Sequence, residues 1–186
     1  KPITFPRIQG ADVCGEIVEV GAGINPSRIG ERIITDGWIR DPEKPFDKNK
    51  TGYFGSECDG GFADYSAIPS SNALSIDSYL TDAELATFSC SYATAEGMLN
   101  RVNVSQEDTV LIPGASGGVG SIAIMILSKF GYNVTAMTGK NDDNIEKYLK
   151  DLGAKNIIDR KVFESESKLL GKGLWDGAVD TVGGNV

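Results

Sequence analysis

One stretch of the sequence indicates the fold of this chain: Val110-Leu111-Ile112-Pro113-Gly114-Ala115-Ser116-Gly117-Gly118-Val119-Gly120-Ser121. A short apolar run at 109–112 predicts a strand, and apolar residues with a helical period at 119–130 predict a helix. The glycines between them follow the spacing Gly114-x-x-Gly117-x-x-Gly120, which differs by one residue from G-x-G-x-x-G. Such a turn lets the backbone approach a diphosphate, which then rests on the N–H groups at the start of the helix.

We therefore predict that this turn binds a dinucleotide. The residues expected to contact it are Gly114, Ala115, Ser116, Gly117, Gly118, Val119 and Gly120. The alternative is a tight strand-to-helix turn that binds no ligand.

The elements that follow the turn predict an α/β fold. Strands are expected at 133–137, 156–158 and 177–182, and a helix is expected at 142–152. Strands and helices that alternate in this order form a parallel sheet with right-handed crossovers.

The first third of the chain is predicted to be mainly β. Strands are expected at 13–20, 31–35, 62–68 and 73–76, and a long loop at 36–60. Thr81-Asp82-Ala83-Glu84 has the form of a capping box, in which the Thr81 hydroxyl and the Glu84 carboxylate each satisfy a backbone N–H. A helix is expected to begin there, and a second helix is expected at 92–101.

The residues at the end of the second parallel strand predict the type of dinucleotide. An acid in this position would bind the 2′-hydroxyl of NAD, whereas Thr138-Gly139-Lys140 offers a hydroxyl and a cation that suit a 2′-phosphate. We therefore expect NADP(H) rather than NAD(H). The alternative is that Asp142 or Asp143 binds the ribose instead of capping a helix. Val182-Gly183, at the end of the last predicted strand, should pass under the adenosine ribose.

The composition excludes several classes of protein. The 186 residues include no histidine, which rules out a Ser-His-Asp triad, an HExxH zinc site or an imidazole proton shuttle within this chain. The net charge of −8 argues against a nucleic-acid partner, and no run approaches the ~18 apolar residues that a membrane span requires. Cys14, Cys58 and Cys90 form no CxxC motif, so we expect a cytoplasmic protein with reduced thiols.

Several segments, in order along the chain, resemble the medium-chain dehydrogenase/reductase superfamily, to which zinc alcohol dehydrogenases and quinone oxidoreductases belong. The matching segments are 10–21 (G-H-E-x-x-G-x-V-x-x-V-G), 29–33 (x-G-D-R-V), 61–65 (G-x-x-A-E-Y), the cofactor turn at 114–120 and the fourth Rossmann strand at 179–184. The resemblance implies a GroES-like β-barrel portion at 1–92 and a doubly wound parallel-sheet Rossmann domain at 93–186. It also implies that both domains are partial in this chain and that the full-length protein is a homodimer.

The resemblance also allows the zinc ligands of the family to be compared with the residues of this chain. Ala11 stands where zinc members have the histidine of G-H-E, Asp12 matches the following acid, and Cys90 falls close to a later ligand. The loop 36–60 contains only Cys58 where a structural zinc lobe has four cysteines. Because a catalytic zinc ion is held by three protein ligands, we expect no metal site in this chain.

Zinc-free members of the superfamily resemble quinone oxidoreductases and enoyl reductases. We therefore expect hydride transfer from NADPH to a small-molecule quinone or an enone or enoyl carbonyl. Two alternatives stay open: a zinc-dependent alcohol dehydrogenase with ligands outside this chain, and a dinucleotide-binding protein without turnover.

Two residues are candidates for catalysis. Tyr92 could donate to a substrate oxygen or simply pack, and Asp12 could act on the substrate or hold a loop. By resemblance, Thr94 matches a hydroxyl residue near the nicotinamide ribose, although a helical threonine can also bond back to the preceding turn. Tyr53 and Trp38 could line a substrate cleft or cover the core.

Overall fold

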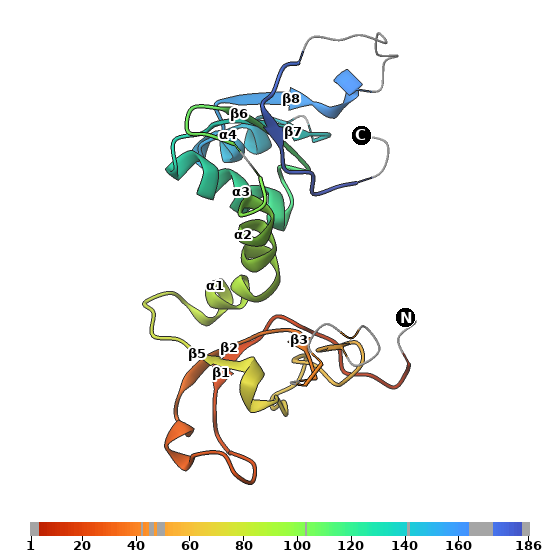
Figure 1. Ribbon diagram of the computed structural model, residues 1–186, viewed down its shortest axis with the longest axis vertical. Helices are drawn as coiled ribbons and strands as arrows, with labels where there is room; N and C mark the ends of the chain where they lie inside the picture. The colour runs from red at the N-terminus through yellow and green to blue at the C-terminus, as the bar shows by residue number, and fades with distance from the viewer. Residues whose placement is uncertain are drawn as a thin grey trace. The chain divides into compact units, whose positions relative to one another are not determined.

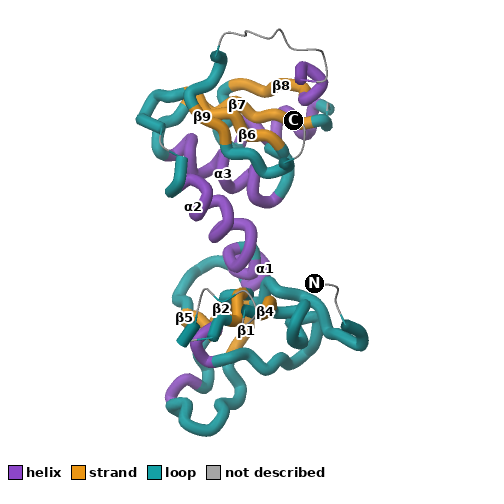
Figure 2. The backbone as a smooth tube through the Cα atoms, turned by 45° about the vertical axis from the view of Figure 1, so that its right-hand side comes forward, coloured by secondary structure: helices purple, strands orange, loops and turns teal. Residues whose placement is uncertain are grey.

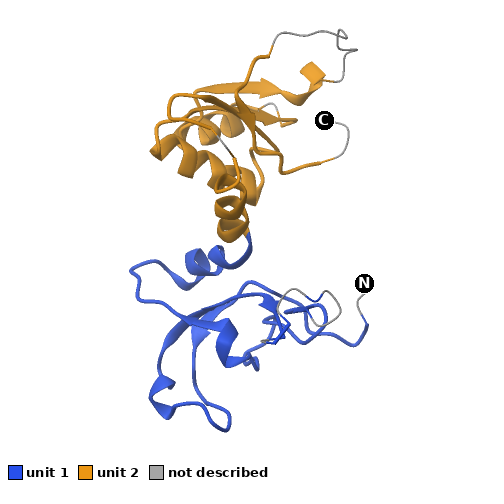
Figure 3. Cartoon of the chain, in the orientation of Figure 1, with its two compact units in different colours: residues 1–90 blue, residues 91–186 orange. Residues whose placement is uncertain are grey.

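The computed structural model describes residues 4–41, 43–44, 47, 51–102, 104–140, 142–163 and 173–183. The chain divides into two compact units, residues 1–90 and residues 91–186 (Figure 3).

The first unit is built on a three-stranded antiparallel sheet (Figure 1). The strands are β1 (Cys14–Glu16), β2 (Arg32–Thr35) and β5 (Ala73–Ser75), with β2 in the centre. Ile33 and Thr35 are buried and alternate with half-buried neighbours along β2, as expected for a strand with one face on the core. The Thr35 hydroxyl donates to the carbonyl of Ala11 at 2.9 Å, which ties the segment before β1 to this sheet.

The predicted loop 36–60 contains a small hairpin, formed by β3 (Trp38–Ile39) and β4 (Gly52–Tyr53). The rings of Trp38 and Tyr53 meet edge to face, with centroids 4.9 Å apart. The composition of this segment hides the hairpin because each strand has only two residues, which is too short for a period to be seen.

The strand expected at 62–68 does not form, and this prediction is wrong. The amides of residues 60–62 donate to carbonyls of residues 8–10, but over residues 63–68 no backbone amide has a backbone acceptor. The Ser66 hydroxyl instead donates to the carbonyl of Gly60 at 2.7 Å. Backbone pairing with residues 8–10 therefore stops at residue 62.

The capping box at Thr81 is confirmed. Helix α1 (Asp82–Ala86) begins after Thr81, whose hydroxyl accepts from the Glu84 amide while the Glu84 carboxylate accepts from the Thr81 amide. Arg32 of β2 donates to the Asp82 carboxylate at 2.8 Å, so a charged contact joins the sheet to this helix start. A π-helical turn, Phe88–Tyr92, follows.

The second unit is an α/β layer structure with a parallel sheet in the order β8-β7-β6-β9 (Figures 1 and 2). The strands are β6 (Thr109–Pro113), β7 (Asn133–Thr138), β8 (Asn156–Asp159) and β9 (Gly177–Ala178). The helices are α2 (Ala93–Leu99), α3 (Gly118–Lys129) and α4 (Asp143–Asp151). This arrangement confirms the predicted order of strands and helices.

Helix α3 packs against β6 and β7, α4 packs against β8, and α2 packs against α3. Their contacts form one apolar core, in which Ile112, Ile124, Val134 and Leu149 are fully buried. Helix α4 ends before Gly153, which has φ +109° as expected for a residue just past a helix.

Strand β9 is shorter than the predicted 177–182. The Asp180 carboxylate accepts from the amides of Val182 and Gly183, so the chain turns just after the strand instead of extending it. Over the described residues, no helix has the length and apolar character needed to span a membrane.

Candidate functional site

The parallel sheet brings the predicted cofactor residues to one edge. Pro113, the last residue of β6, pairs with Met137, and Thr138, the last residue of β7, pairs with Asp159 at the end of β8. The chain passes from β8 at one side of the sheet to β9 at the other, so the strand order reverses beside β6. In open α/β sheets a ligand binds at the carboxyl ends of the strands, next to such a reversal.

The glycine turn between β6 and α3 has the shape of a cradle. Gly114 has φ +69°, and a Cβ atom at this position would lie 2.5 Å from the Thr181 hydroxyl. A Cβ atom on Gly120 would overlap the carbonyl oxygen of Gly114 and lie 3.0 Å from the Cα of Ala115. The first glycine therefore permits the turn, and the last permits the helix to pack directly against it.

The start of α3 leaves backbone donors free. Gly117 occupies the N-cap position without a side-chain hydrogen bond to the helix, and the Ser121 amide is the first that bonds back, to the Gly117 carbonyl at 2.9 Å. Within the described residues, the amides of Gly118, Val119 and Gly120 have no acceptor. Free amides at the positive end of a helix dipole suit a diphosphate, so the turn fits the group that the sequence predicts.

At the end of β7, the Thr138 side chain is buried, and the cationic residue Lys140 follows two positions later. The Thr138 hydroxyl lies 3.3 Å from the hydroxyl of Ser116 and accepts from the Lys140 amide at 3.1 Å. The Arg160 side chain lies close to Gly139. A Cβ atom added to this glycine would be 3.0 Å from the guanidinium Nε.

Sequence reasoning missed Arg160. It directly follows β8, and the third strand of a parallel sheet ends at the same edge as the second. A search for cations after every predicted strand, and not only after the second, would have found it.

The acids near β7 lie in a neighbouring depression. Asp142 caps α4, since its carboxylate accepts from the Ile145 amide at 3.0 Å. A cavity of about 360 Å³ is lined by Lys140, Asp142, Asp143, Glu146, Ile157, Ile158 and Asp159. The Asp142 carboxylate thus has the capping role, and the alternative that Asp142 or Asp143 binds the ribose stays a prediction.

The loop after β9 is held by Asp180. Hydrogen bonds from the Gly183 and Val182 amides stabilise the carboxylate and lower the pKa of Asp180. The same loop approaches the glycine turn, because Thr181 donates to the carbonyl of Pro113 at 2.6 Å. Val182 and Gly183 therefore reach the edge where the sequence placed them.

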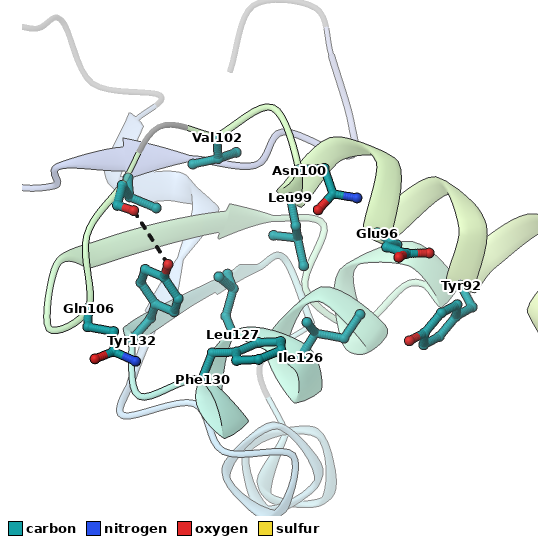
Figure 4. Close-up of a pocket in the computed structure, with 11 residues that line it drawn as sticks. Tyr92, Glu96, Leu99, Asn100, Val102, Gln106, Ile126, Leu127, Phe130 and Tyr132 are labelled. Carbon is teal, nitrogen blue, oxygen red and sulfur yellow. Dashed lines mark hydrogen bonds between the residues drawn. The ribbon is translucent and has the colours of Figure 1, made fainter.

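The structure places Tyr92 and Thr94 in different surroundings. Tyr92 lines a cavity of about 370 Å³ together with Ile126 from the C-terminal half of α3 and Phe130, the residue that follows this helix (Figure 4). Thr94 is exposed on α2, and its hydroxyl has no hydrogen-bond partner among the described residues, so the bond to the preceding turn is not formed. The roles proposed for both residues stay predictions.

Asp12, Tyr53 and Cys90 lie together in the first unit. The Asp12 carboxylate accepts from the Cys90 amide, and partial burial raises the pKa of Asp12. Burial, with the Cys90 side chain and nearby Asp12 and Asp36, raises the pKa of Tyr53 to about 12, which keeps the phenol protonated. The loop-holding role considered for Asp12 thus has a bond to support it.

The described residues of this chain include no complete set of zinc ligands. Ala11 offers no ligand, and in the described part of the chain no three cysteine or acidic side chains gather closely enough to hold a metal. A tetrahedral zinc site supplied by this chain alone would need such a group.

Comparison with known proteins agrees with the fold. Residues 1–78 match the family model of the alcohol dehydrogenase GroES-like domain. YhfP of Bacillus subtilis, which is named as a quinone oxidoreductase, is 32% identical over 97% of this chain and 51% of its own length. The acryloyl-coenzyme A reductase of Metallosphaera sedula is 29% identical over 96% of this chain and 54% of its own length.

Two solved structures are similar over nearly the whole chain. Bacillus subtilis yhfP with NAD bound matches with a TM-score of 0.78 and 31% identity, over 98% of this chain and 51% of its own. The yhdH oxidoreductase of Salmonella enterica in complex with NADP matches with a TM-score of 0.77 and 30% identity, over 98% and 52%. The chain belongs to the medium-chain dehydrogenase/reductase superfamily, and it spans about half the length of the curated relatives it matches.

Proposed function

We propose that this chain is part of an NADPH-dependent oxidoreductase that transfers hydride to a quinone or to an enone or enoyl carbonyl without zinc. The observation that carries the proposal is the cradle between β6 and α3, where free amides face the carboxyl edge of the sheet. Relatives named as a quinone oxidoreductase and an acryloyl-coenzyme A reductase support the substrate class.

Each part of the edge has a role in holding the dinucleotide. The amides of Gly118 and Val119 would hold the diphosphate, and the loop ending at Gly183 would lie beside the adenosine ribose. When bound, the nicotinamide supplies the hydride. A conjugated carbonyl is already electrophilic, so the protein has to orient it and donate to its oxygen, for which the Tyr92 hydroxyl is the candidate. Asp12 is the second candidate for a catalytic role at the substrate.

The preference for NADP(H) is proposed from the charges beside Gly139. Lys140 and Arg160 supply two cations there, and a guanidinium suits a phosphate because it donates two parallel hydrogen bonds. Asp142 and Asp159 are occupied nearby by backbone amides, those of Ile145 and Lys161.

Equilibrium binding tests this preference. The wild-type chain should bind NADPH more tightly than NADH. Arg160→Gln and Lys140→Gln should each weaken NADPH binding by about tenfold and leave NADH binding nearly unchanged. Lys155→Gln, a cation at the opposite edge of the sheet, is the matched control. Tighter binding of NADH by the wild type, or equal losses for both dinucleotides, would overturn the preference.

The reaction is tested with the full-length protein. NADPH oxidation is followed with a panel of quinones and enones, and bound metal is measured on the same preparation. Turnover without bound metal is expected. Stoichiometric zinc that is lost together with activity would favour an alcohol dehydrogenase, and NADPH binding without reduction of any acceptor would favour a non-catalytic binding protein.

A further inference from the structure

Ser91 lies against the first residue of α3. It belongs to the π-helical turn Phe88–Tyr92, and a Cβ atom on Gly118 would lie 2.8 Å from the Ser91 hydroxyl oxygen and 3.6 Å from its Cβ. The two residues are far apart in the sequence but lie in the same compact unit. Gly118 therefore lets the serine side chain approach the start of the helix.

The hydroxyl of Ser91 is available for a ligand. The residue is half-buried, and among the described residues its hydroxyl has no hydrogen-bond partner. The amides of Gly118, Val119 and Gly120 beside it have no acceptor in the same part of the chain. A serine hydroxyl can rotate to donate, so a side-chain donor lies next to the first residue of a helix whose leading amides are free.

We propose that Ser91 donates a hydrogen bond to the diphosphate of the bound dinucleotide, next to the amides that begin α3. This inference rests on the proposed function, because it assumes that the glycine turn binds a dinucleotide. An anion at this point accepts from every free donor, and hydrogen bonds to charged groups are stronger than those between neutral groups. Ser91 lies outside the glycine motif and adds a side-chain contact to a site otherwise made of backbone.

The test compares ligands with and without a diphosphate. Dissociation constants of NADPH, ADP and adenosine 2′-monophosphate are measured for the wild-type chain and for Ser91→Ala. The variant should bind NADPH and ADP about 5- to 20-fold more weakly, and its affinity for adenosine 2′-monophosphate should not change. Ser128→Ala removes a hydroxyl from the other end of α3, where it bonds to Leu152, and should leave all three affinities unchanged.

The outcomes separate this inference from the proposed function. Equal affinities in Ser91→Ala and the wild type, or equal losses for all three ligands, would overturn the role of Ser91 while leaving the dinucleotide site in place. A wild-type chain that binds none of the three ligands would overturn the proposed function, and the role of Ser91 with it. Circular dichroism of the variant confirms that the fold is retained.

Discussion

The Thr181 hydroxyl donates a 2.6 Å hydrogen bond to the carbonyl of Pro113, and this bond fastens the loop after β9 to the end of β6. Pro113 is buried, so Thr181→Val leaves its carbonyl without this donor, at a cost of about 1–3 kcal/mol in the free energy of unfolding. Urea denaturation measures this cost. Thr181→Ser should restore most of the stability, and a valine variant as stable as the wild type would show that the bond contributes nothing.

Asp180 should make the stability of this loop depend on pH. Its folded-state pKa is lowered by the Gly183 and Val182 amides, so the carboxylate contributes stability above the unfolded pKa of about 3.9. That contribution is lost as the pH falls through the lower folded-state pKa. Asp180→Asn should therefore be less stable than the wild type near neutral pH, and the difference should shrink as the pH falls below about 3.9, as followed by urea denaturation. A stability difference that stays the same from neutral to acid pH would argue against this role of the Asp180 carboxylate.

Gly120 should not tolerate a side chain. Gly120→Ala pushes a Cβ atom into the Gly114 carbonyl and against Ala115, both of which are backbone, so either the turn or the helix must move. We expect loss of dinucleotide binding and a lower melting temperature. Gly97→Ala in α2 is the contrast, since its Cβ atom would meet only Arg101 at 3.6 Å and should add about 0.4–1 kcal/mol of stability. Equal behaviour of the two alanine variants would contradict the close approach at Gly120.

Two neighbouring residues on α3 should differ sharply in their contribution to the core. Ile124 is fully buried between the helices and the sheet, whereas Met125 is 49% exposed. Ile124→Ala should therefore lower the free energy of unfolding by about 2–5 kcal/mol, and Met125→Ala by well under 1 kcal/mol. Thermal and urea denaturation measure both. A larger loss of stability for Met125→Ala than for Ile124→Ala would contradict the assignment of Ile124 to the buried face of α3.

Cys14 should react slowly with alkylating reagents. Burial and the adjacent Asp82 carboxylate raise the pKa of its thiol, so less thiolate is present at a given pH. Iodoacetamide labelling of Cys14 is followed by mass spectrometry from pH 7 to 10. The pH midpoint of the labelling rate should lie above that of a free cysteine. Asp82→Asn should lower this midpoint, because the carboxylate is removed and Arg32 remains nearby. A midpoint that stays unchanged in the variant would argue against the carboxylate as a cause.

Local sequence determined the elements of the second unit. The strand, the glycine turn and the helix at 109–130 are set by residues within a few positions of one another, and so is the Thr81–Glu84 capping box. Capping hydrogen bonds and the periodic spacing of apolar residues involve positions only a few residues apart, so they can be recognised directly in the sequence. The strand at 62–68 was predicted wrongly because a strand also needs a partner, and backbone pairing with residues 8–10 stops at residue 62.

Tertiary structure alone decided which distant side chains join the predicted site. Arg160 reaches Gly139, Ser91 reaches Gly118, and Thr181 bonds to Pro113, although each pair is separated by 21 or more positions in the sequence. The order of the parallel strands and the close packing at each glycine create these contacts, and no local period encodes them. The sequence by itself therefore determined that a dinucleotide turn is present and which class of fold carries it. The folded chain determined which hydroxyl and cationic groups surround that turn, because their positions depend on how the strand ends meet at the edge of the sheet.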